Sequence, residues 1–123
     1  MSSIQETLQS FIKVRGVRAA LIVGSDGLVL ESAMASDSLP LDIEAVGAVA
    51  ASGLVPAAEI GLQTGNGSLT QAIYEYSDAV IVIEALGDDD AVLVIVTDII
   101  ANLGLLRLQA RRARPELAQA IRG

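Results

Sequence analysis

Residues 68–97, SLTQAIYEYSDAVIVIEALGDDDAVLVIVT, decide the fold, because they predict three consecutive strands joined by two tight turns. Residues 68–76 alternate polar and apolar positions, whereas residues 79–86 and 91–97 are apolar almost throughout. A strand that is apolar on both sides must be covered on both sides, while an alternating strand can lie at the margin of a sheet. We therefore expect a β-meander whose second and third strands are central and whose first strand is an edge.

A second strand pair precedes this meander. Residues 19–23 are apolar and residues 28–32 soon turn polar. Between them, Asp26 and Gly27 supply the positive φ that a tight hairpin turn requires. By the same argument, the first strand of this pair should be central and the second should be an edge.

Three segments with helical periodicity surround the strands. Apolar residues recur at three- and four-residue steps in residues 3–14, in residues 40–62 and after Asp98, which can cap the last helix. Ser38 and Pro40 are expected to begin the middle helix. Pro56 should kink or interrupt it, and Pro115 should break or bend the last helix, because proline lacks a backbone N–H and clashes with the preceding turn.

The order of these elements predicts one α+β domain over residues 1–123. The simplest sheet with two edges and three central strands is antiparallel, with strand order 2-1-5-4-3 in an αββαβββα chain. Central strands need cover on both faces, so helices should lie on both faces of the sheet. One such arrangement places the first and last helices on one face and the middle helix on the other.

Composition limits the chemistry that this chain can perform. Its 123 residues include no Cys and no His, which removes disulfides, thiolate metal sites and the commonest general base. We expect a cytoplasmic protein without catalytic residues, metal or cofactor. The uncharged run of residues 45–58 is shorter than the roughly 20 residues of a spanning helix, so we expect a buried helix and no membrane insertion.

Charge is unevenly distributed along the chain. The net charge is −7, yet all eight basic residues lie near the two ends, at positions 13–18 and 107–122. The middle of the chain is therefore unsuited to binding nucleic acid. If the helices are arranged as predicted, one outer face should be basic and the other acidic.

The chain resembles the Roadblock/LC7 domains, and among them the bacterial MglB-like proteins. The resemblance lies in the element order, in the strand of residues 20–23 followed by residues 25–29, and in the Ala- and Gly-rich middle helix. It implies a homodimer in which the middle helix and the third strand pair with their copies. The expected interface residues are Gly47, Ala50, Gly53, Leu54, Ala57, Gln71, Ile73, Tyr74, Glu75 and Tyr76. Self-pairing would also cover an edge strand that is otherwise prone to aggregation.

The resemblance further implies a non-catalytic adaptor that binds a small Ras-like GTPase and stimulates its hydrolysis of GTP. The partner would dock on the middle helix, at Asp42, Glu44, Ala45, Val49, Ser52 and Glu59. No Lys or Arg lies on that helix, so stimulation through it should work by ordering the GTPase's own catalytic groups.

Other polar residues have simpler interpretations. We expect Asp88, Asp89 and Asp90 to form a solvated turn, because no further ligands at calcium-binding spacing accompany them. Glu84 is expected to be exposed near a strand end, and the arginines of the last helix to form a solvated stripe. Two alternative functions stay open: an adaptor that holds a larger complex through the basic face, and a small-molecule sensor with a pocket between sheet and helix.

Overall fold

The computed structural model describes residues 3–36, 40–87 and 91–122. Along the chain the elements are α1 (Ser3–Ile12), β1 (Val17–Gly24), β2 (Val29–Met34), α2 (Ile43–Thr64), β3 (Gln71–Glu75), β4 (Val80–Ala85), β5 (Ala91–Thr97) and α3 (Leu103–Arg122). The predicted αββαβββα order is confirmed.

The five strands form one antiparallel sheet of order β2-β1-β5-β4-β3, as predicted. The central position of β5 agrees with its sequence, since all seven of its residues are buried. At one margin, β3 pairs only with β4 among the described strands, with Tyr74 opposite Ile81. The hairpin between β1 and β2 turns at Gly27, whose φ of 87° is readily adopted only by glycine.

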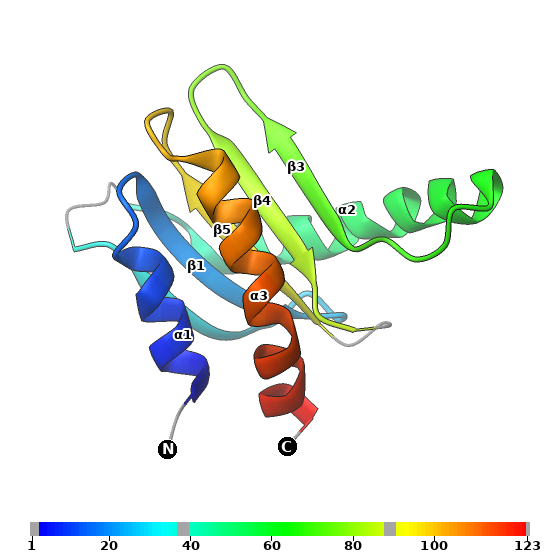
Figure 1. Ribbon diagram of the computed structural model, residues 1–123, viewed down its shortest axis with the longest axis horizontal. Helices are drawn as coiled ribbons and strands as arrows, with labels where there is room; N and C mark the ends of the chain where they lie inside the picture. The colour runs from blue at the N-terminus through cyan, green and yellow to red at the C-terminus, as the bar shows by residue number, and fades with distance from the viewer. Residues whose placement is uncertain (1–2, 37–39, 88–90, 123) are drawn as a thin grey trace.

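The helices cover the two faces of the sheet unequally (Figure 1). On the near face, α1 and α3 run side by side, and they bury Leu8, Phe11, Leu106 and Leu117 against the sheet. On the far face, α2 crosses the sheet alone and extends past β3. The prediction that helices cover both faces of the sheet is therefore confirmed.

The boundaries of α2 differ from the prediction. Asp42 is the N-cap, and its carboxylate accepts a hydrogen bond from the Ala45 amide at 3.0 Å, so the helix begins after Pro40. Ser38 lies outside the described residues. Pro56 does not interrupt the helix, which continues to Thr64 and ends at Gly65 in a left-handed conformation. The proline is exposed, so its ring displaces no packed neighbour.

The last helix also departs from expectation at both ends. Asn102, not Asp98, caps α3 by accepting a hydrogen bond from the Leu105 amide at 3.0 Å; Asp98 instead stabilises the preceding turn through the Ile100 amide. The helix continues through Pro115 to Arg122. Burial of Leu117 and Ala118 beyond the proline stabilises this continuation, because tertiary packing outweighs local propensity.

Candidate interaction site

The first candidate surface is α2, which leaves most of its apolar side chains uncovered. Within its 22 residues only Gly47 and Ala50 are buried. Val49, Val55, Ile60 and Leu62 are between 64% and 72% exposed. Several large apolar groups exposed along one helix are typical of a surface that a partner covers.

The geometry of the helix explains this exposure. A Cβ placed on Gly47 would lie 2.8 Å from Val29 Cγ2, so glycine lets the first half of α2 approach the sheet closely. The apolar stripe that includes Ile60 continues along the second half, but α2 has by then passed the margin of the sheet (Figure 1). The sequence prediction of a buried helix is therefore wrong for the outer side and the second half of α2. By length and composition α2 could also span a membrane, a test that core helices of soluble proteins pass as well.

The second candidate surface is the open edge of β3. Its tyrosine Tyr74 is half-buried on the α2 side of the sheet, where its hydroxyl lies 3.4 Å from a Cβ built on Gly53. Tyr76 follows the strand and is 56% exposed. The β3 edge and α2 therefore present adjoining surfaces. A two-fold contact between copies that uses both elements needs such an arrangement.

The structure places the predicted interface residues in different environments. Gly47 and Ala50 already pack inside the protomer. Gly53, Leu54, Ala57 and Ile73 are half-buried, and Glu75 is exposed at the end of β3. The predicted partner-binding residues share full exposure on the outer side and N-terminal end of α2: Asp42, Glu44, Ala45, Val49, Ser52 and Glu59. Both assignments stay predictions.

An apolar groove of about 380 Å³ lies between α2 and one end of the sheet. Leu54, Val55 and Leu62 line it from the helix, and Leu69 and Val92 from the sheet side. No charged side chain is among its described lining residues. Such a groove can accept only uncharged, mainly apolar groups.

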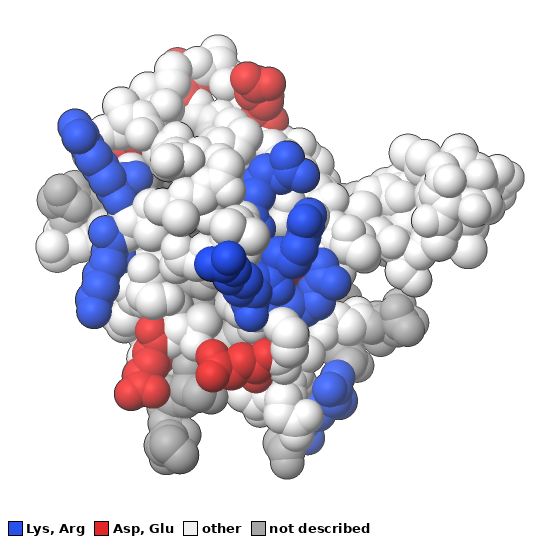
Figure 2. All heavy atoms as spheres, viewed as in Figure 1, with Lys and Arg blue, Asp and Glu red and all other residues white. Residues whose placement is uncertain are grey.

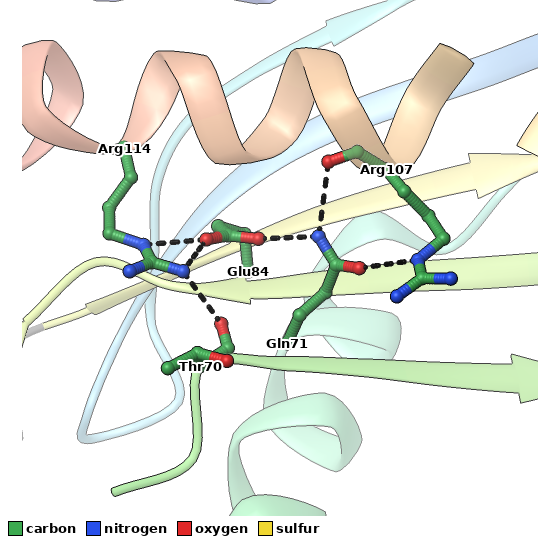
Figure 3. A network of polar contacts seen from close by, with 5 residues as sticks. All are labelled: Thr70, Gln71, Glu84, Arg107 and Arg114. Carbon is green, nitrogen blue, oxygen red and sulfur yellow. Dashed lines mark hydrogen bonds and ion pairs between the residues drawn. The ribbon is translucent and has the colours of Figure 1, made fainter. Parts of the chain in front are cut away.

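The opposite face holds a polar network beneath α3 (Figure 3). Arg114 donates from Nε and Nη2 to Glu84 Oε2, and Nη2 also lies 3.4 Å from the Thr70 carbonyl oxygen. Gln71 donates to Glu84 Oε1 at 2.7 Å and accepts from Arg107 Nε at 2.9 Å. The network joins β3, β4 and α3, so it anchors the start of the edge strand.

Glu84 corrects the sequence prediction of an exposed carboxylate. Its side chain is fully buried, and Arg114 is 31% exposed. A buried carboxylate is tolerated only when it is paired and hydrogen-bonded, which Arg114 and Gln71 accomplish. The sequence did contain a signal, because Glu84 is the single charge within an otherwise apolar strand. Its partner was missed because the arginines of the last helix were expected to form a solvated stripe.

Basic side chains gather over α3 on the face that it shares with α1 (Figure 2). Blue spheres form a cluster over the middle of α3, and further groups lie toward the opposite margin. Red spheres lie above and below the central cluster in the same view. The face that was predicted to be basic therefore carries a basic patch with acidic borders. Asp88, Asp89 and Asp90 lie outside the described residues.

Comparison with known proteins agrees with this architecture. The family model for the Roadblock/LC7 domain matches residues 3–97. The uncharacterized protein MJ0310 of Methanocaldococcus jannaschii is 31% identical over 114 residues, which cover 93% of this chain and 96% of that protein.

Two solved structures share the fold closely. An MglB with a tetrameric arrangement matches with a TM-score of 0.88 at 24% identity, covering 96% of this chain and 87% of that one. The gliding protein MglB from Thermus thermophilus matches with the same TM-score and coverage at 23% identity. At these identities the likeness establishes the fold.

Proposed function

Because the chain belongs to the Roadblock/LC7 domain family, we propose that it is a non-catalytic homodimeric regulator or scaffold that binds a small Ras-like GTPase and stimulates its hydrolysis of GTP. The observation that carries this proposal is the uncovered apolar surface of α2 beside the open edge of β3. The MglB likeness supports the choice of partner.

Dimerisation uses the part of α2 that extends beyond the sheet. Ile60 and Leu62 are 64% and 71% exposed in one protomer, and a second copy placed antiparallel along β3 would cover them. The same contact satisfies the unpaired backbone groups of the β3 edge, which otherwise invite aggregation. Both surfaces therefore have one common explanation.

The GTPase docks on the side of α2 that faces away from the sheet. This surface carries Asp42, Glu44 and Glu59 beside Val49, and α2 contains neither Lys nor Arg. An arginine supplied in trans can raise the rate of GTP hydrolysis by about 10³–10⁵-fold, but α2 has none to supply. Stimulation through α2 therefore works by ordering the GTPase's own switch segments and catalytic groups.

The direct test measures single-turnover GTP hydrolysis by a Ras-like GTPase from the same genome, with and without this protein. Acceleration that the exposed-face variant Val49→Arg abolishes and the variant Ile99→Arg, in the turn before α3, retains supports the proposal; both residues are more than 60% exposed. Binding without acceleration would reduce the function to scaffolding. Absence of binding to every Ras-like GTPase of that genome would refute the proposal.

A second candidate function, a small-molecule sensor, is favoured by the apolar groove beside α2. Its volume of about 380 Å³ lies within the range of ligand sites. Titration of the dimer with an uncharged apolar fluorophore separates the two functions. Binding that Ala58→Trp blocks supports the sensor, since Ala58 lines the groove, and failure to bind supports the regulator alone.

A further inference from the structure

The outward side of α3 carries arginines that the fold itself does not use. Arg114 is engaged by Glu84, and Arg107 donates from Nε to Gln71. Across residues 3–36, 40–87 and 91–122, Arg111 and Arg112 make no hydrogen bond or ion pair, and both are exposed. Their charges contribute nothing to packing, so stability does not explain their position.

Two leucines lie on the same side of α3. Leu105 and Leu108 are 46% and 43% exposed, while Leu106 and Ala110 of the same helix are fully buried. Leu105, Leu108 and Arg112 follow one another at steps of three and four residues, so they form one row, and Arg111 lies one turn beyond Leu108. Two apolar groups and then two cationic groups therefore follow one another along one exposed helix surface.

The charges around this surface restrict what can bind to it. Acidic side chains border the basic cluster above and below (Figure 2), and the chain as a whole carries a charge of −7. An extended anionic surface, such as a lipid bilayer or a nucleic-acid backbone, would bring its charges against these acidic borders. A short segment that lies over the middle of α3, between these borders, meets the arginines and leucines.

We infer that the outward side of α3, comprising Leu105, Leu108, Arg111 and Arg112, docks an acidic amphipathic segment of a partner protein. The carboxylates of the segment pair with the two arginines, and its apolar side chains cover the two leucines. This surface lies on the sheet face opposite to α2. The protein can therefore hold this partner and a GTPase at the same time, and the inference does not depend on the proposed GTPase activity.

The test uses a fluorescein-labelled synthetic peptide in which leucines recur every three or four residues between glutamates. Fluorescence anisotropy with the intact protein should show saturable binding that weakens about tenfold between low and high salt, because exposed charges are screened. Replacing the leucines of the peptide with serine, or its glutamates with lysine, should weaken or abolish binding. Amide chemical shifts should change along α3 and not along α2.

Matched charge-reversal variants locate the site. Arg111→Glu with Arg112→Glu should reduce peptide affinity by at least about tenfold, since it replaces two attractions with two repulsions. Lys13→Glu with Arg15→Glu makes the same charge change at exposed residues outside α3, and should alter affinity by less than about twofold. Leu105→Ser with Leu108→Ser should also weaken binding, whereas salt-bridge chemistry alone would leave it unchanged.

Three results would overturn the inference. They are absence of peptide binding, equal losses in the two charge-reversal variants, and tighter binding of phosphatidylserine vesicles than of the peptide. Circular dichroism should show unchanged folding of the Arg111→Glu, Arg112→Glu protein, because neither side chain has an intramolecular partner within the described residues. Stimulated GTP hydrolysis, which involves α2, should persist in this variant, so the two proposals can fail separately.

Discussion

The two faces of the sheet are covered in contrasting ways. On one face, α1 and α3 bury large side chains such as Phe11, Leu106 and Leu117, and the Glu84 network fastens α3 to the strands. On the other face, α2 makes its close approach through Gly47 and Ala50 and leaves its larger side chains exposed. One face, the closed face, is thus covered by large side chains packed within the protomer, while the other, the open face, leaves large apolar side chains exposed.

The largest expected effect of substitution lies in the closed face. Leu106→Ala removes a fully buried side chain and should lower the free energy of unfolding by about 2–5 kcal/mol. Val49→Ala on the open face should change it by less than about 0.5 kcal/mol, because Val49 is 70% exposed. Urea unfolding at protein concentrations that favour the monomer measures both. Equal losses of unfolding free energy in the two variants would show that the two faces contribute equally to stability.

Removal of the buried ion pair should have the next largest effect. Arg114→Ala leaves the Glu84 carboxylate buried with Gln71 as its remaining side-chain donor, and should cost about 2–4 kcal/mol of stability. Arg112→Ala, close by on the exposed side of α3, should cost less than about 0.5 kcal/mol. Guanidinium unfolding distinguishes them. In a double-mutant cycle with Glu84→Gln, a coupling energy near zero would contradict the network.

Substitutions on the exposed side of α2 should change dimerisation more than they change the free energy of unfolding. Ile60→Glu with Leu62→Glu places charges where a second copy is proposed to pack, and should raise the dimer dissociation constant at least about 30-fold, roughly 2 kcal/mol. Leu28→Glu with Leu30→Glu, at 62% and 52% exposure on the β1–β2 hairpin, is the matched control and should leave it unchanged. Analytical ultracentrifugation measures the dissociation constant. A wild-type chain that stays monomeric at high concentration would refute the dimer.

The smallest expected effect concerns catalysis by the partner. The combined change Arg107→Ala, Arg111→Ala and Arg112→Ala should leave stimulated GTP hydrolysis within about twofold of wild type, because these arginines lie on the face opposite to α2. Single-turnover hydrolysis provides the measurement. A collapse toward the unstimulated rate would mean that an arginine of α3 acts in trans.

Local pattern was sufficient for the sheet. A strand that is buried on both sides has an almost unbroken apolar sequence. The sequence therefore predicted that β1, β4 and β5 are central and that β2 and β3 are edges. Asp26 and Gly27 likewise predicted the hairpin, because the backbone conformation of a tight turn depends on the turn residues themselves. The presence of helices on both faces followed from the requirement for two-sided cover, which does not by itself say that α2 lies alone on one face.

Long-range contacts decided the rest. Whether Glu84 is exposed depends on Arg114, which lies 30 residues later and reaches it only because α3 packs across β4. The last helix continues through Pro115 because packing of Leu117 and Ala118 beyond it outweighs the local cost of the proline. The exposure of Ile60 depends on where the sheet ends beneath α2, which a periodic stripe cannot record. Amino-acid order thus determined the strands and their two-sided cover, while the tertiary structure alone decided which charges are paired and which helix is left open.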